Sequence, residues 1–186
     1  NNMYLYSCAN DYASDFCDRL YRFFDAEFCL KEPDWFTPYE ELVSTPIGRV
    51  LSFGGEDRSI EVTTLIVPPQ AGHSSHIADY GDRKSLVQTC LNATNGRVLS
   101  IEWKRSTQST KYASVVDLLD LIDYAVDTCS TSKVNLVGLC QGGWLSAIYA
   151  ALYPQKIRTL TIAGAPIDFH IGNGYITKLA DNTPMW

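Results

Sequence analysis

The chain has 186 residues, of which 46% are hydrophobic, and this length suits one sizeable core in a single domain. The formal net charge of -6 provides no basic field for phosphate backbones or anionic lipid, so we expect no nucleic-acid partner. No apolar run approaches the roughly 20 residues that cross a bilayer, and no signal-peptide pattern opens the chain, so we expect no membrane span.

The six cysteines form no C-x-x-C pair and no cluster with histidines at zinc-ligand spacing. We therefore expect no metal site and no cofactor. A chain of this length needs no disulfide bridges to supplement its core, which favours a reducing, cytoplasmic location.

The first predicted element is a helix over residues 11–28, where bulky apolar residues recur every three or four positions. Prolines at positions 33 and 38 make residues 31–38 a connector. We expect a helical N-terminal preface over residues 1–36 and a core domain over residues 37–186.

Strand and helix patterns then alternate along the chain. Strands are predicted at residues 50–53, 60–67, 98–103, 134–138 and 159–163, and helices at residues 85–91, 112–126 and 142–152. His76, between the second strand and the first of these helices, is expected at the surface. Because right-handed crossovers place helices over both faces of a parallel sheet, the predicted class is α/β with such a sheet.

Residues 137–143 read V-G-L-C-Q-G-G and stand between a predicted strand and a predicted helix. This is the G-x-nucleophile-x-G pattern of a nucleophile elbow, with Cys140 where serine is usual, and it indicates an α/β-hydrolase-type sheet. The elbow requires strained backbone angles at Cys140, and the positive end of the following helix favours a thiolate. We expect Cys140 to be the catalytic nucleophile; the alternative is a buried structural cysteine beside packing glycines.

Two further groups complete the expected site. The backbone N–H of Gln141, at the start of the helix, is the first expected oxyanion donor, and Gly72, in the loop after the strand at 60–67, is the second. His73, in the same loop, and Trp144, after the two glycines, are expected to contact substrate. His73 could equally point to solvent.

Five segments resemble polyhydroxyalkanoate synthases and the related intracellular polyhydroxybutyrate depolymerases. They are T-P-Y-E-E-L-V at 37–43, T-L-I-V-P-P at 64–69, S-I-E-W at 100–103, V-N-L-V-G-L-C-Q-G-G at 134–143 and A-P-I-D-F at 165–169. The resemblance implies that Cys140, activated by a histidine, carries a 3-hydroxyacyl group taken from 3-hydroxyacyl-CoA or from polyhydroxyalkanoate polymer.

The match also departs from the synthases. They usually have a small residue or threonine where this chain has Trp144, and residues 71–73 are closer to the depolymerases. Synthesis and degradation therefore both stay open, as does a homo-oligomer.

The acid and the histidine of an α/β hydrolase follow its seventh and eighth strands. Only one strand is predicted after Cys140, with Asp168 and His170 just beyond it, too early in the fold for either role. We therefore expect a fragment truncated at its C-terminal side, with no histidine nitrogen within about 4 Å of the Cys140 sulfur. The alternative is a catalytically incomplete homologue that binds polymer granules or a partner enzyme.

Overall fold

The computed structural model describes residues 15–20, 33–54, 59–70, 74–129, 132–168, 171–172 and 174–182. The chain divides into two units, Asn1–Pro33 and Asp34–Trp186. In the first unit, residues 15–20 are helical, and the remainder of the helix predicted over 11–28 lies outside the described residues.

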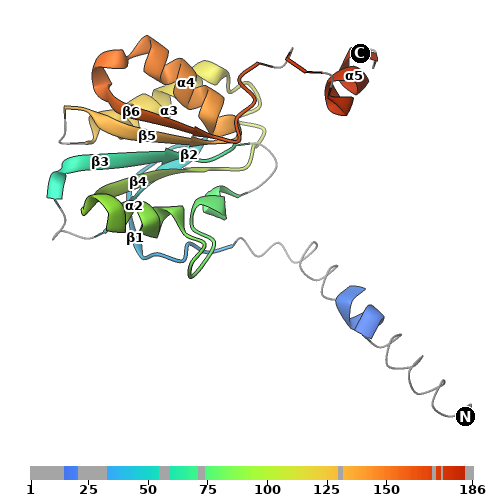
Figure 1. Cartoon of the computed structure of the whole chain (residues 1–186), viewed down its shortest axis with the longest axis horizontal. Helices are drawn as coiled ribbons and strands as arrows, with labels where there is room; N and C mark the ends of the chain where they lie inside the picture. The colour runs from blue at the N-terminus through green and yellow to red at the C-terminus, as the bar shows by residue number, and fades with distance from the viewer. Residues whose placement is uncertain are drawn as a thin grey trace, which may run out of the picture. The chain divides into compact units, whose positions relative to one another are not determined.

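The second unit is built on a six-stranded sheet (Figure 1). Its strands are β1 (Tyr39–Ser44), β2 (Gly48–Phe53), β3 (Ser59–Val67), β4 (Gly96–Trp103), β5 (Val134–Leu139) and β6 (Ile157–Ala163), in the order β1-β2-β4-β3-β5-β6. The four strands β4, β3, β5 and β6 are parallel, whereas β2 runs antiparallel to both β1 and β4. The predicted α/β class is confirmed, and the predicted parallel sheet is mostly parallel, with antiparallel strands at one side.

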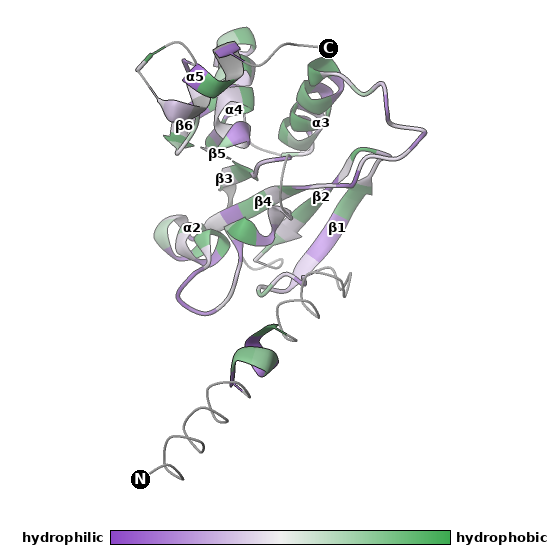
Figure 2. Ribbon diagram, turned by 90° about the vertical axis from the view of Figure 1, so that its right-hand side faces the viewer, coloured by the Kyte–Doolittle hydropathy of each residue, from purple (hydrophilic) through white to green (hydrophobic). Residues whose placement is uncertain are grey.

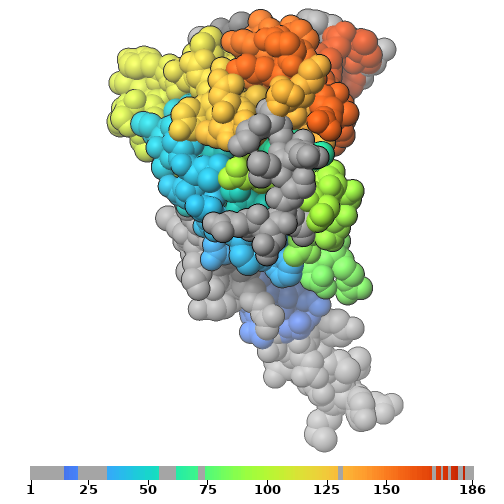
Figure 3. All heavy atoms as spheres, turned by 90° about the vertical axis from the view of Figure 1, so that its left-hand side faces the viewer, coloured from blue at the N-terminus to red at the C-terminus, as the bar shows by residue number. Residues whose placement is uncertain are grey.

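Helices cover both faces of this sheet (Figures 2 and 3). The helices are α2 (Leu86–Thr94), α3 (Val115–Asp127), α4 (Gln141–Leu152) and α5 (Tyr175–Asn182), with short 3-10 turns η1 (Ser75–Ala78) and η2 (Pro154–Lys156). Helices α3 and α4 share one hydrophobic cluster with the sheet, and α2 contributes to a second cluster with other sheet residues. In the space-filling view, α4 is orange at the top and α2 is green lower on the right.

The central strand β3 is buried on both faces, as expected of a strand with a parallel neighbour on each side. Leu65 and Val67 face the cluster under α3 and α4, while Ile66 between them faces the cluster under α2. All three side chains are fully buried. The carboxyl end of β3 is thereby fixed in the middle of the sheet, beside the end of β5.

Strand β1 was not predicted, because its side chains are mostly exposed and carry no clear alternation of apolar and polar residues. It forms through its pairing with β2, which includes an irregularity between Glu41 and Val43. Local sequence does not encode such a partner, so an edge strand of this kind is visible only in the folded sheet.

The expectation that His76 lies at the surface is wrong. Its side chain is buried in η1, with its ring centroid 4.8 Å from that of Trp35. The Ser74 hydroxyl contacts Nδ1 of the same ring. Trp35 precedes β1 by only a few residues, so it is this N-terminal segment of the unit that covers the histidine.

Candidate active site

Cys140 lies at the turn between β5, which ends at Leu139, and α4, which begins at Gln141. Its backbone angles are φ 49° and ψ -118°, outside the regions that residues with a side chain ordinarily occupy. The predicted strained turn is confirmed by these angles. Its thiol is exposed.

Two backbone hydrogen bonds hold this conformation. The Cys140 N–H donates to the carbonyl oxygen of Ala163, the last residue of β6, at 2.8 Å. The Cys140 carbonyl oxygen accepts from the Gly143 N–H, also at 2.8 Å. The nucleophile candidate is thus tied to the neighbouring strand and to the first turn of its own helix.

The glycines of the motif are required by close backbone contacts. A Cβ atom on Gly142 would lie 1.9 Å from the Val67 carbonyl oxygen, and one on Gly138 would lie 2.5 Å from the Gly142 carbonyl oxygen. Real Cβ atoms do not approach other atoms so closely, so α4 can reach the ends of β3 and β5 only without these side chains.

Gln141 has a side-chain contact that the sequence did not predict. Its Oε1 accepts a hydrogen bond from the Gln70 N–H at 3.0 Å, which links the first residue of α4 to the loop after β3. This is the loop in which Gly72 and His73 were predicted to act. Both of those residues, and His170, lie outside the described residues.

A cavity of about 490 Å³ opens beside Cys140, within the range of roughly 300 to 1,000 Å³ that is usual for small-molecule sites. The ends of β5 and β6 and the segment from η1 to α2 form its walls. Its lining residues are Ile77, Arg83, Lys84, Ser85, Leu86, Thr89, Leu139, Cys140, Ala163 and Gly164. The exposed thiol therefore meets a partly apolar space with two cationic side chains on its wall.

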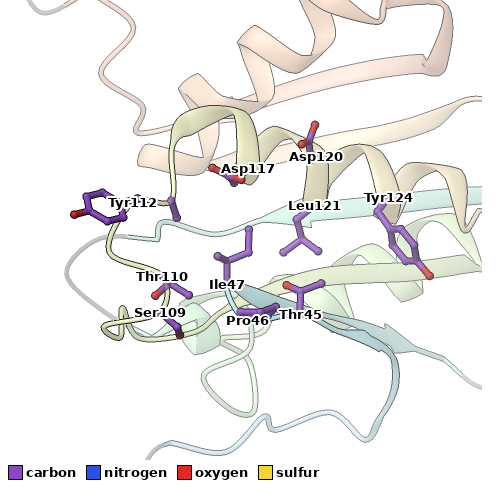
Figure 4. A pocket seen from close by; sticks show the side chains of 11 residues that line it. Thr45, Pro46, Ile47, Ser109, Thr110, Tyr112, Asp117, Asp120, Leu121 and Tyr124 are labelled. Atoms are coloured by element: carbon purple, nitrogen blue, oxygen red, sulfur yellow. The ribbon is translucent and has the colours of Figure 1, made fainter.

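A second cavity, of about 510 Å³, lies between the β1–β2 turn, the segment that precedes α3, and α3 itself (Figure 4). Ile47 and Leu121 point toward each other across it, and Asp117 and Asp120 of α3 carry its acidic groups. The hydrogen bonds that Asp117 accepts from the Ser114 N–H and hydroxyl lower the pKa of this carboxyl group. Asp117 thus acts as a cap for α3.

Trp144 is partly buried against the hydrophobic cluster under α3 and α4. Among the described residues, it does not line the cavity beside Cys140. Its predicted contact with substrate stays a prediction.

Other cysteines of the described structure differ from Cys140 in their surroundings. Burial raises the pKa of the Cys129 thiol to about 11, and it also raises the pKa of Cys90. Both thiols therefore stay protonated near neutral pH, and the thiolate is the reactive form.

Within the described ranges, no three His, Cys, Asp or Glu side chains are grouped so that they could hold a metal ion. The described helices also include none that is long and apolar enough to cross a bilayer.

Comparison with curated proteins finds poly(3-hydroxyalkanoate) polymerase subunits PhaC. The protein from Allochromatium vinosum is 30% identical over 115 residues, covering 59% of this chain and 32% of that protein. The one from Haloferax mediterranei is 29% identical over 150 residues, covering 78% and 30%. The resemblance to polyhydroxyalkanoate synthases is confirmed, and the chain spans about a third of the length of these relatives.

Solved structures with a similar fold include hydrolases of low sequence identity. An esterase from Pyrobaculum calidifontis matches with a TM-score of 0.57 and 15% identity, over 77% of this chain and 49% of that one. A thioesterase domain from the curacin biosynthetic pathway matches with a TM-score of 0.53 and 18% identity, over 77% and 50%. At this identity the likeness concerns the fold alone.

A family model described as alpha/beta hydrolase fold matches residues 63–184, a range that begins within β3 and includes β4 to β6 and the elbow at Cys140. Sheet order, elbow geometry and this match agree, and the chain belongs to the alpha/beta hydrolase fold family.

Proposed function

We propose that this protein is an acyl-transfer enzyme of polyhydroxyalkanoate metabolism in which the Cys140 sulfur accepts a 3-hydroxyacyl group. The observation that carries the proposal is the exposed thiol of Cys140, held at φ 49° and ψ -118° on the wall of a cavity. An exposed cysteine in this strained turn has no evident structural use, and strain of this kind is concentrated at functional sites. The polymerase relatives supply the acyl class.

The chemistry follows from the position of the thiol. The Cys140 thiolate attacks the carbonyl carbon of a 3-hydroxyacyl thioester, and a tetrahedral oxyanion forms. When the carbonyl re-forms, the bond to the leaving sulfur breaks, the acyl group stays on Cys140, and the proton that Cys140 gave up passes to the leaving thiolate. With a polyester as substrate, the leaving group is the hydroxyl end of the cleaved chain.

Gln141 supports the oxyanion in this proposal. It follows the nucleophile directly, the position from which the enzymes of this fold direct a backbone N–H to the developing charge. Its side chain holds the Gln70 N–H at 3.0 Å, which keeps the start of the next loop beside the elbow. Gly72, two residues further on, is the proposed second donor.

A base must take the thiol proton and return it, and in this fold the histidine that does so follows the eighth strand. The sheet described here has six strands. We therefore propose that the 186-residue chain can accept one acyl group at Cys140 and that it turns over slowly.

The experiment is to incubate the chain with a 3-hydroxybutyryl thioester and to locate the acyl group by peptide mass spectrometry. We expect one added 3-hydroxybutyryl group on the peptide that contains Cys140, and none on that peptide in Cys140→Ala. Cys17→Ala, which removes another exposed thiol, should be acylated as the wild type is. An acyl group distributed over several cysteines, or rapid turnover that survives Cys140→Ala, would contradict the proposal.

A further inference from the structure

The segment that connects η1 to α2 places two cations, Arg83 and Lys84, on the wall of the cavity beside Cys140. We propose that Arg83 and Lys84 form an anion-binding rim that selects acyl substrates carrying a negative charge. The inference rests on the proposed acyl-transfer function and specifies the substrate of the same site.

The distribution of charge and apolar surface in the cavity supports such a rim. Arg83 and Lys84 are both exposed, with 92% of the Arg83 side chain accessible, so their charges lie at the mouth. Leu86 and Leu139, in contrast, are only partly exposed and give the wall its apolar part. A ligand with an apolar stem near the thiol and an anionic end at the solvent side satisfies both parts of the wall.

The two cations stand on a closed turn. The Lys84 N–H donates to the Gly81 carbonyl oxygen at 2.9 Å, and the Tyr80 N–H donates to the Lys84 carbonyl oxygen at 3.2 Å. Arg83, inside this turn, has φ 58°, an unusual angle for a residue with a side chain. The backbone positions from which both side chains project are therefore fixed before any ligand arrives.

A buried carboxylate anchors the base of the turn. Asp79 is fully buried and accepts hydrogen bonds from the Thr37 N–H at 2.6 Å and from the Thr37 hydroxyl at 3.0 Å. Its backbone also forms an antiparallel bridge with Ser85. The ends of the turn are thus fixed to the body of the unit, which limits the entropy lost when a ligand binds to the rim.

The positive charge of the rim contrasts with the negative charge of the chain as a whole and of the second cavity. The chain as a whole has a net charge of -6, and the second cavity carries Asp117 and Asp120 on its wall. Among the described residues, those that line the cavity beside Cys140 include two cations and no carboxylate. Asp82 lies 3.7 Å from the Arg83 Nε, but both side chains are solvated, and an ion pair of this kind is weak.

Two acyl substrates have the required chemistry. The thiol part of an acyl-CoA carries phosphates, and a linear oligomer of a hydroxy acid ends in a carboxylate. Arg and Lys bind either anion through charge-assisted hydrogen bonds. The first source suits an enzyme that builds polyester, and the second suits one that shortens it.

The test measures equilibrium binding to the 186-residue chain by calorimetry at low ionic strength, with two pairs of ligands. CoA is compared with pantetheine, which lacks phosphates, and a linear 3-hydroxybutyrate trimer is compared with its methyl ester. We expect one charged ligand to bind more tightly than its neutral counterpart, and R83Q/K84Q to weaken that ligand by about tenfold. Added salt should weaken it in the wild type and much less in the variant.

The matched control is K133Q/R158Q, which removes one arginine and one lysine charge near the amino ends of β5 and β6, away from the cavity. Lys133 precedes β5 and Arg158 lies near the start of β6, whereas Cys140 follows the end of β5, and both control side chains are exposed. This variant should bind all four ligands as the wild type does. The charge-reversed R83E/K84E should weaken the charged ligand further, and the thermal midpoint of each variant verifies its folding.

The identity of the affected ligand distinguishes the two sources of the anion. The inference is overturned if the wild type binds neither charged ligand more tightly than its neutral counterpart, or if R83Q/K84Q and K133Q/R158Q have the same effect. Acylation of wild-type Cys140 by a neutral N-acetylcysteamine thioester tests the proposed function separately. If Cys140 is not acylated but the charged ligand still binds more tightly, the proposed function is wrong and the anion-binding rim stands. If Cys140 is acylated but no charged ligand binds more tightly, only the proposal of the rim is wrong.

Discussion

Gly142 lies so close to the end of β3 that no side chain fits between them. In Gly142→Ala, the new Cβ would lie 1.9 Å from the Val67 carbonyl oxygen, a backbone atom that cannot rotate away. We expect a loss of about 2 to 4 kcal/mol in the free energy of unfolding, because α4 must move off the sheet. Urea unfolding measures the loss, and the iodoacetamide labelling rate of Cys140 reports the altered turn.

Gly174→Ala is the control for this substitution. A Cβ at Gly174 would meet the Thr177 hydroxyl at 3.6 Å, an ordinary contact distance. Equal stability losses in the two variants would show that close packing at the elbow is not the cause.

Ser146 in α4 is fully buried, and its hydroxyl has no hydrogen-bond partner among the described residues. We expect Ser146→Ala to leave the free energy of unfolding unchanged or to raise it by up to about 1 kcal/mol, since it removes an unsatisfied polar group. Ser75 is an equally buried serine whose hydroxyl accepts from the Trp103 N–H at 3.0 Å. Ser75→Ala should therefore cost about 1 to 3 kcal/mol, and urea unfolding of both variants compares them. A cost of the same size for Ser146→Ala would mean that its hydroxyl has a partner.

The elbow could be predicted from the sequence because its requirements are local. Strand, glycine, Cys140, glycine and helix follow one another within a few residues, and the strained angles are a consequence of that order. The side-chain role of Gln141 could not be predicted, since Gln70 is 71 positions away. Arg83 and Lys84 were missed for the same reason: only the folded sheet brings the turn after η1 to the end of β5.

At the scale of elements, a polar cluster joins α3 to α4 and η2. Asp123 of α3 accepts hydrogen bonds from the Tyr149 hydroxyl at 2.6 Å and from the Lys156 Nζ at 2.8 Å. Partial burial raises the pKa of Asp123, but the hydrogen bonds from Lys156 and Tyr149 outweigh it, so the net shift is downward. Because the folded-state pKa lies below the unfolded value of about 3.9, this stabilisation is present at neutral pH and is lost as the pH falls through the folded-state pKa.

We expect Asp123→Asn to reduce the acid sensitivity of the fold. The variant should be less stable than the wild type at pH 7 by about 1 kcal/mol, because the cluster is partly solvated, and the two should converge near pH 2. Urea unfolding at a series of pH values measures the difference. Asp120→Asn changes an exposed position on the same helix, and its free energy of unfolding should depend on pH as that of the wild type does. If the free energies of unfolding of Asp123→Asn and the wild type differed by the same amount at every pH, the Asp123 carboxylate would not be the source of the acid sensitivity.

The ends of the helices and strands are less accurately predicted from sequence patterns than their presence. The apolar pattern of α2 ends at Leu91, and the helix was predicted to end there, but it continues to Thr94. It ends because Asn95 adopts the left-handed conformation of a helix C-cap, with φ 48°. Strands buried on both faces, such as β3, were predicted nearly to their full length, since β-branched residues and the prolines that follow define them.

At the scale of the whole unit, β6 is paired with β5 on one side and with no described strand on the other. Leu160 and Ile162 are 39% and 38% exposed on this strand. An unpaired edge with apolar side chains promotes association between chains, and a lysine on the edge opposes it. We expect Thr161→Lys to lower the self-association of the 186-residue chain several-fold in sedimentation velocity over a range of concentrations.

Gln155→Lys is the matched control, because it adds the same charge at an exposed position of η2, outside the strand. It should leave self-association near that of the wild type. An equal effect of both lysines would attribute the change to net charge and not to the strand edge.

From the hydrogen bond between the Cys140 N–H and the Ala163 carbonyl oxygen, we expect a fixed order in which the site forms during synthesis. The turn needs the end of β3 to receive Gly142 and the end of β6 to receive the Cys140 N–H. We therefore expect a nascent chain that has just exposed Cys140 to lack the strained turn until residue 163 has left the ribosome and β6 has paired with β5. On this expectation, the thiol of the emerging chain reaches its reactive geometry only when the neighbouring strand is complete, and pulse labelling of ribosome-stalled chains of increasing length with a thiol reagent measures when this happens.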